Sequence, residues 1–311
     1  MKKILLDTDI GPDCDDVGAL ALLNHFADRG LCEILGIGHC TSNRFGAPAI
    51  DVICRAYGRC DLPIGTFGGD GFLCDEKCQK YNRDLAERYA HRFQTAAPED
   101  AVAIYRRLLA EVDDHSVDFV SIGPLNDLSA LLDSPPDGCS PLCGRELVRR
   151  KVNRLVAMAG IFPAPDPRVR ERAEKLCGCR LPDFAEYNVW CDIAAAQNVA
   201  ENWQTEKIYL GFEAGLIETG ARLAELAPDH PVRRAYELYT EHGLRYSWDL
   251  LTVDFAVTEN QTHFALSPSG RVSFTDGGQT LWQPGEGTDR FLFYACDEER
   301  IIADIDKYLV E

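Results

Sequence analysis

The feature that most constrains the fold is an acidic loop that follows the first apolar run of the chain. Residues 4–6 predict a short buried strand, and apolar residues recur at helical spacing over 17–26. Between these runs lie five carboxylates: Asp7, Asp9, Asp13, Asp15 and Asp16. They therefore sit where a strand ends and a helix begins, which is the edge at which open α/β sheets bind ligands.

Five acids this close together need an explanation beyond chain reversal. Like charges raise one another's pKa and reduce stability unless a cation neutralises them. Ca²⁺ accepts crowded, flexible carboxylate ligands better than Mg²⁺ does, so the loop predicts a calcium site. Asp residues also form turns and cap helices, but capping uses one or two acids rather than five. The spacing resembles an EF-hand loop only loosely, because the Glu that ends such a loop is absent.

A second interpretation treats the same loop as a phosphatase site. Asp7-Thr8-Asp9 after a strand resembles the nucleophile loop of the haloacid dehalogenase phosphatases. Asp7 would then be the nucleophile and Asp9 the acid. Such an enzyme also needs a downstream lysine at a junction between a strand and a helix.

Composition limits the class of protein and its partners. With 311 residues, 46% of them hydrophobic, the chain can bury a large core, and the absence of a linker favours one α/β domain over 1–311. A formal net charge of −18 argues against a nucleic acid polymer or an anionic membrane as partner. Neither a signal peptide nor a membrane span is evident, so we expect a cytoplasmic protein. The 13 cysteines lack paired zinc-knuckle spacing and are expected to be free thiols.

Strand and helix patterns alternate along the chain. Strands are expected at 34–38, 62–65, 117–122, 152–159 and 207–210, and helices at 48–57, 101–109, 192–202, 231–241 and 250–257. This alternation predicts an open, mostly parallel sheet flanked by helices. Segment 68–97 reads as a loop over the site and 161–183 as an insertion. Residues 260–311 form a C-terminal extension with a small hairpin and a helix.

With these pieces in order, the chain resembles the inosine-uridine preferring nucleoside hydrolase family from residue 3 to about residue 260. The resemblance starts at the acidic loop and continues through five further motifs. These are Ser42-Asn43, Gly123-Pro124-Leu125-Asn126, Met158-Ala159-Gly160, Ala185-Glu186-Tyr187-Asn188 with Asp192, and Trp248-Asp249. The resemblance implies cleavage of a ribonucleoside by water to a free base and ribose, by a homo-oligomer that is a dimer or tetramer.

The resemblance also implies roles for single residues. Ca²⁺ would be held by Asp9, Asp16, the backbone carbonyl of Asn126, and Asp249. The sugar hydroxyls would be held by Asn43, Asp15, Glu186, Asn188 and Asp249. Asp9 could take a proton from water. The extra acid Asp13 leaves open whether Asp13 or Asp15 pairs with Asp16. Glu186 and Asn188 could instead cap the following helix.

Two departures from the family pattern concern the base and the sugar. Members with uridine activity carry His before the late Asp, whereas this chain has Trp248, which resembles the purine-preferring members and could stack on a purine. Trp248 could equally be a core residue, and His242 is the nearest alternative acid. The family's Gly-Asn after the Met-Gly-Gly segment is replaced here by Ile161-Phe162. A non-catalytic nucleoside- or sugar-binding protein on the same scaffold is therefore the remaining alternative.

Overall fold

A nine-stranded sheet forms the centre of the computed structural model, which describes residues 1–311. The strand order is β10-β13-β7-β6-β5-β1-β2-β3-β4. The middle strands are β1 (Lys2–Thr8), β2 (Cys32–His39), β5 (Val117–Ser121), β6 (Val152–Met158) and β7 (Glu206–Leu210). β3 (Ile64–Thr66) and β13 (Arg290–Tyr294) flank these strands, and β4 (Glu99–Asp100) and β10 (Phe264–Leu266) form the two edges. Only β10 runs antiparallel, so the predicted open, mostly parallel sheet is confirmed.

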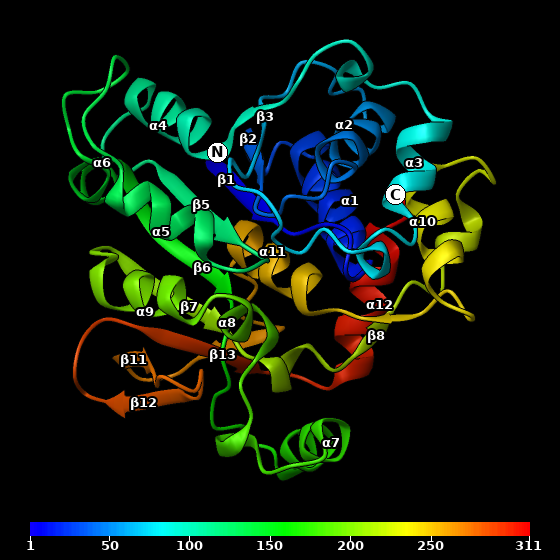
Figure 1. The fold of residues 1–311 in the computed structure, drawn as a ribbon. Helices are drawn as coiled ribbons and strands as arrows, with labels where there is room; N and C mark the ends of the chain where they lie inside the picture. The colour runs from blue at the N-terminus through cyan, green and yellow to red at the C-terminus, as the bar shows by residue number, and fades with distance from the viewer.

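Helices cover both faces of this sheet (Figure 1). One face carries α1 (Asp15–Asp28), α2 (Gly46–Ala56), α10 (Pro231–Tyr239), α11 (Trp248–Thr258) and α12 (Glu298–Tyr308). The other carries α4 (Ala101–Glu111), α5 (Asn126–Asp133), α6 (Gly144–Lys151) and α9 (Ile193–Asn202). Both faces of the middle strands are therefore apolar, which explains why these strands read as continuous hydrophobic runs.

Successive residues of each middle strand enter opposite cores. Leu5, Phe119 and Leu155 pack under α4, α5 and α9. Their neighbours Leu6, Val120 and Val156 pack under α1 and α11. The period of two places these side chains on alternate faces, and the two separate apolar cores fix the register of the sheet.

Three helices lie where the sequence patterns predicted no helix. α3 (Asn82–Arg88) lies in segment 68–97, which was expected to be a loop, and α7 (Pro167–Cys177) lies in the expected insertion 161–183. α6 lies just before the strand expected at 152–159. A further short helix, α8 (Tyr187–Cys191), precedes α9. The small hairpin is confirmed as β11 (Gly270–Phe274) and β12 (Thr280–Pro284), and β8 (Glu218–Thr219) pairs with β9 (Arg245–Tyr246). No helix is both long and apolar enough to cross a membrane.

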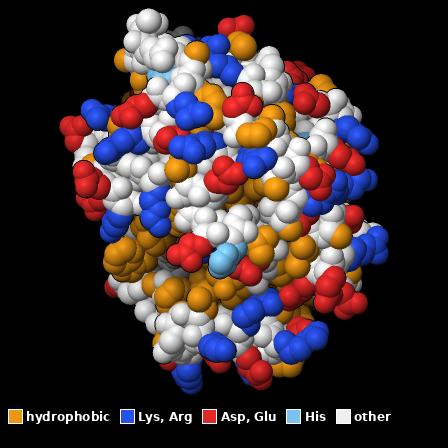
Figure 2. All heavy atoms as spheres, turned by 90° about the vertical axis from the view of Figure 1, so that its right-hand side faces the viewer, with side chains coloured by type: hydrophobic (Ala, Val, Ile, Leu, Met, Phe, Trp, Pro, Cys, Tyr) orange, Lys and Arg blue, Asp and Glu red, His pale blue; other side chains and the backbone are white.

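The C-terminal segment also completes the central sheet. β13 pairs in parallel with β7, with Arg290 opposite Ile208 and Phe291 opposite Tyr209. Charges are spread over the surface: on the face drawn in Figure 2, acidic and basic side chains are interspersed. The net charge of −18 is therefore not gathered into one acidic area on that face. All 13 cysteines are free.

Candidate active site

A cavity of about 480 Å³ opens at the carboxyl edge of the sheet. Its walls come from the loop after β1, the ends of β5 and β6, the start of α8 and the start of α11. Asp7 lies opposite Gly38 in β2 and opposite Ser121 in β5, so the loops after these strands emerge side by side. Seven of the site residues expected from the sequence line this cavity: Asp9, Asp15, Asp16, Glu186, Asn188, Trp248 and Asp249.

Three carboxylates form the centre of the cavity. Asp15 and Asp16 lie in the first turn of α1, and Asp249 lies in the first turn of α11. Each offers an oxygen within 4.8 Å of the others, and all three side chains are buried. The Asp249 amide donates to Asp15 Oδ2 at 3.3 Å, and the hydroxyl of Thr8 donates to Asp16 Oδ1. Two helix starts therefore deliver the acids to one point.

Burial controls the electrostatics of these carboxylates. It raises the pKa of Asp15, Asp16 and Asp249 well above the usual range, and the neighbouring negative charges raise it further. Asp9 lies beside the triad, and burial raises its pKa to about 7. Buried carboxylates without a counter-charge are unfavourable, and oxygen-only donor sets suit a hard divalent cation. The donor chemistry at this site thus fits Ca²⁺.

The remaining acids of the loop have other partners. Arg245 Nε donates to Asp13 Oδ1 and Oδ2 at 2.8 and 2.9 Å, so Asp13 is held in an ion pair. Asp15, rather than Asp13, is the acid that joins Asp16 and Asp249. Asp7 is completely buried, accepts a hydrogen bond from the Tyr105 hydroxyl and does not line the cavity. The interpretation of Asp7 as a phosphatase nucleophile is therefore wrong, because a substrate in the cavity cannot reach it.

Glu186 and Asn188 line the wall across from the acidic loop. Glu186 caps α8: Oε1 accepts from the Asn188 amide at 2.8 Å, and Oε2 accepts from the amides of Val189 and Gly160, each at 3.1 Å. Burial raises the pKa of Glu186 to about 7, against these hydrogen bonds. Asn188 Nδ2 donates to the Met158 carbonyl at 3.0 Å. Glu186 therefore both caps α8 and lines the cavity.

Two asparagines expected at the site lie outside its lining. Asn43 is buried, donates from Nδ2 to the Cys78 carbonyl at 2.8 Å and accepts from the Phe45 amide at 3.0 Å. Each polar atom of that side chain already makes one hydrogen bond to backbone, and its expected contact with a sugar hydroxyl stays a prediction. Asn126 donates from Nδ2 to the Cys40 carbonyl at 2.9 Å, and its buried Oδ1 has no hydrogen-bond partner.

An aromatic wall closes the cavity near Asp249. Trp248 stacks on Phe212, with ring centroids 5.7 Å apart, and both rings line the cavity. The indole packs against Gly215, where an added Cβ would lie only 1.8 Å from Trp248 Cδ1. Trp248 is therefore at once a core residue and a wall of the cavity, which combines the two alternatives that the sequence left open.

His242 lies away from the cavity, and Arg245, which the sequence analysis did not single out, lines it. His242 is exposed, lies in a bend before β9 and does not line the cavity, so its position does not support a role as the acid. Arg245 does line the cavity, with its guanidinium 5.4 Å from the Trp248 ring centroid. Its position three residues before the Trp-Asp motif was the available signal. Phe212 carried no such signal, because it reaches the site only through the packing of the loop after β7.

Comparisons with known proteins agree with the family resemblance of the sequence motifs. Residues 4–265 match the family model described as inosine-uridine preferring nucleoside hydrolase. The fold is similar to that of an inosine-uridine preferring nucleoside hydrolase from Bacillus anthracis, with a TM-score of 0.71, 18% identity, and coverage of 100% of this chain and 99% of that chain. It is also similar to a purine-preferring ribonucleoside hydrolase from Gardnerella vaginalis, with a TM-score of 0.70, 14% identity, and coverage of 99% and 98%. No curated protein matches the chain in sequence.

Proposed function

Because the chain belongs to the inosine-uridine preferring nucleoside hydrolase family, we propose that it hydrolyses the N-glycosidic bond of a ribonucleoside, with purines favoured, to give a free base and ribose. The main observation behind this proposal is the buried triad of Asp15, Asp16 and Asp249 in a cavity that is also lined by the aromatic ring of Trp248. Such a cavity offers hydroxyl-binding groups at one end and a stacking surface at the other.

The metal proposal is Ca²⁺ held by Asp15, Asp16 and Asp249, with Asp9 beside them. A bound Ca²⁺ would supply a Lewis acid that lowers the pKa of water and helps to orient the ribose hydroxyls. Asp9 would then act as the general base, because its carboxyl lines the cavity beside the proposed metal ligands. The backbone carbonyl of Asn126, at the start of α5, remains a proposed additional ligand.

The carboxylates also suit the charge that develops during this reaction. Cleavage of a glycosidic bond passes through a state with positive charge on the sugar ring. Preorganised negative groups stabilise such a charge most when they are held in a dry cavity. Asp15, Glu186 and the carbonyl group of Asn188 line the cavity and are proposed to bind the sugar hydroxyls. No covalent nucleophile is required.

The purine preference rests on Trp248. Its ring lines the cavity and stacks on Phe212, and we propose that it contacts the base. Stacking could make a purine easier to protonate and so reduce the need for a side-chain acid, which fits the position of His242 away from the cavity. Arg245, paired with Asp13, lies beside the Trp248 ring at this end of the site.

The direct experiment is turnover of a panel of purine and pyrimidine nucleosides with Ca²⁺ present and reducing sugar measured. We expect release of ribose, with inosine or adenosine ahead of uridine. Binding of a nucleoside without any turnover would instead favour a non-catalytic nucleoside-binding protein. Uridine ahead of both purines would overturn the purine preference while leaving the hydrolase proposal in place.

A further inference from the structure

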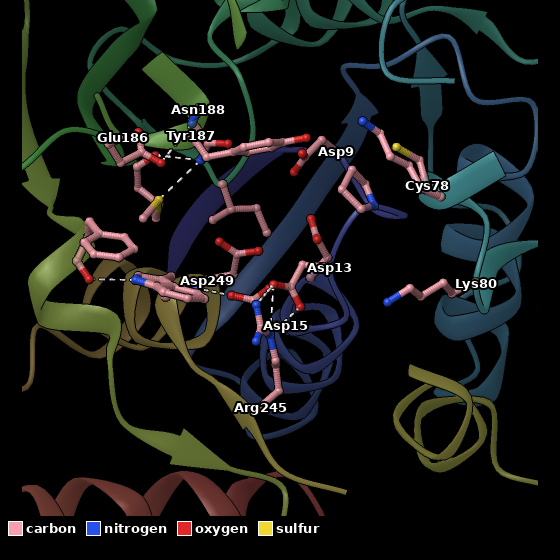
Figure 3. A pocket seen from close by; sticks show the side chains of 17 residues that line it. Asp9, Asp13, Asp15, Cys78, Lys80, Glu186, Tyr187, Asn188, Arg245 and Asp249 are labelled. Carbon is pink, nitrogen blue, oxygen red and sulfur yellow. Dashed lines mark hydrogen bonds and ion pairs between the residues drawn. The ribbon is translucent and has the colours of Figure 1, made fainter. Parts of the chain in front are cut away.

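The active-site cavity carries positive charge on the side away from Glu186 and Asn188. Lys80 and Arg245 lie there (Figure 3). Lys77 also lines the cavity, and all three residues come from segments outside the acidic loop. An uncharged nucleoside has no anionic group that these cations could bind. Their arrangement with the neighbouring carboxylates therefore indicates what else the cavity can hold.

The charge of Arg245 is already balanced. Its guanidinium forms a two-oxygen ion pair with Asp13, and the same group lies 5.7 Å from the ring centroid of Tyr239. The Tyr239 hydroxyl donates to the Pro12 carbonyl at 3.0 Å, which fixes the ring against the acidic loop. This corner of the cavity thus contains one neutral ion pair on a fixed aromatic ring.

Lys80 adds a second cation to the same ring. Its Nζ lies 4.3 Å from the Tyr239 centroid, and it forms no ion pair with a carboxylate. Lys77 has only a long contact of 3.8 Å with Asp75, and both of those side chains are about three-quarters exposed. Two cations therefore share Tyr239 with a single carboxylate, and the ammonium of Lys80 is left uncompensated at the cavity wall.

The segment that bears Lys80 is anchored to the site. The hydroxyl of its neighbour Tyr81 donates to the Asp13 carbonyl, and the Cys78 carbonyl accepts hydrogen bonds from Asn43 and Asn82 at 2.8 and 3.2 Å. These contacts join residues 78–82 to the loops after β1 and β2. The backbone position of Lys80 relative to the carboxylate triad is thus set by buried hydrogen bonds rather than by a free loop.

From this arrangement we propose that Lys80, with the Arg245–Asp13 pair beside it, holds an anionic group on the substrate, namely a phosphate carried by the ribosyl compound. The substrate class is then a ribonucleoside phosphate rather than a bare ribonucleoside. This inference rests on the proposed N-glycosidic hydrolysis. A phosphate is an anion that an ammonium holds through charge-assisted hydrogen bonds, and the guanidinium of Arg245 stays paired with Asp13 beside it.

The test compares inosine 5′-monophosphate with inosine in the calcium-loaded protein. We expect kcat/KM for the nucleotide to exceed that for the nucleoside by about tenfold or more, as a charge-assisted hydrogen bond provides. Lys80→Ala should reduce this ratio about tenfold, whereas Lys80→Arg should keep most of it because the positive charge remains. Lys175→Ala, a matched loss of one exposed lysine on α7, should leave the ratio unchanged.

Each outcome decides the inference. A ratio of one or less in the unmodified protein, or an unchanged ratio in Lys80→Ala, overturns it while leaving nucleoside hydrolysis intact. If neither compound is hydrolysed, the proposed function fails, and calorimetric binding of the same two compounds decides the inference instead. Equal dissociation constants then overturn the phosphate site. Tighter binding of the nucleotide that Lys80→Ala removes supports it.

Discussion

The indole Nε1 of Trp248 donates a hydrogen bond to the Phe212 carbonyl at 2.7 Å, while the two rings stack at 5.7 Å. The bond ties the first residue of α11 to the short 3₁₀ turn Phe212–Gly215 and orients the indole against the cavity. The aromatic wall is thus preorganised by the protein before any base is bound.

Removing this wall should affect the chemical step more than substrate binding. Trp248→Phe retains a ring but loses the bond to Phe212, and Trp248→Ala loses both. We expect kcat for inosine to fall by about tenfold in Trp248→Ala, with a smaller change in KM and an intermediate value for Trp248→Phe. Steady-state kinetics on the folded fraction measures this effect. A change confined to KM would assign the indole to ground-state binding alone.

The metal proposal predicts a linked loss of activity and stability on chelation. Without a cation, Asp15, Asp16 and Asp249 repel one another, so removal of bound metal should lower both turnover and Tm. Ca²⁺ should restore both more effectively than Mg²⁺ does. Metal analysis and thermal unfolding of the dialysed protein test this. Full activity after exhaustive chelation would contradict the proposal.

Glu186 should show separable effects on folding and on catalysis. Its carboxylate accepts three backbone hydrogen bonds, so Glu186→Ala is expected to lower the free energy of unfolding by about 1 kcal/mol, as loss of a helix cap does. Glu186→Gln keeps one of the two acceptor oxygens and loses the charge, so it should lower Tm less than Glu186→Ala does while still reducing kcat/KM. Asp192→Asn, at the cap of α9, serves as a control for capping alone. Normal kinetics in Glu186→Gln would make Glu186 a structural residue only.

Glu213 should make the protein less stable as the pH rises. Burial raises its pKa to about 8, against an unfolded value near 4.5, so the folded state binds the extra proton between these limits. The free energy of unfolding therefore falls from about pH 4.5 to about pH 8 by a few kcal/mol from this group. Denaturant titrations of Glu213→Gln should show a weaker fall than the unmodified protein. Glu218→Gln, an exposed change in β8, should leave the slope unaltered.

His263 should contribute stability in its charged form. Its two ring nitrogens face Asp254 and Asp304 at 2.8 and 2.9 Å, so both can donate only when the ring is protonated. Burial lowers the pKa of His263, but the two carboxylates outweigh it and the net direction is upward. The contribution is therefore complete below pH 6.5 and is lost as the pH rises through the raised pKa. His263→Asn should lose stability chiefly on the acidic side of this range, as measured by denaturant midpoints.

Sequence patterns predicted those parts of the fold whose signal is local. The middle strands are continuous apolar runs, and the acidic loop marks the ligand edge, so both could be inferred before the structure. α7 was not predicted, because only Val169 and Ala173 among its 11 residues are buried and its sequence is highly charged. β13 was not predicted, because it pairs with β7 about 80 residues earlier in the chain and a local sequence pattern does not report such a pairing.

The same distinction applies to the site. Asp15, Asp16 and Asp249 could be proposed because each follows or begins a recognisable element. Arg245 and Lys80 could not, because their meaning depends on a shared neighbour, Tyr239, that only tertiary packing provides. Asn43 lies at the expected edge of the sheet, but its hydrogen bond to the Cys78 carbonyl depends on tertiary packing that the sequence does not report.

The first two residues of α11 place the stacking ring and a proposed metal ligand on a single turn of helix. A ligand that moves the start of this helix therefore displaces Trp248 and Asp249 together. Thermodynamic reciprocity then requires that the base changes the affinity for the cation by the same factor by which the cation changes the affinity for the base. Cation affinity measured with and without a purine would report this coupling, even where no bond is cleaved.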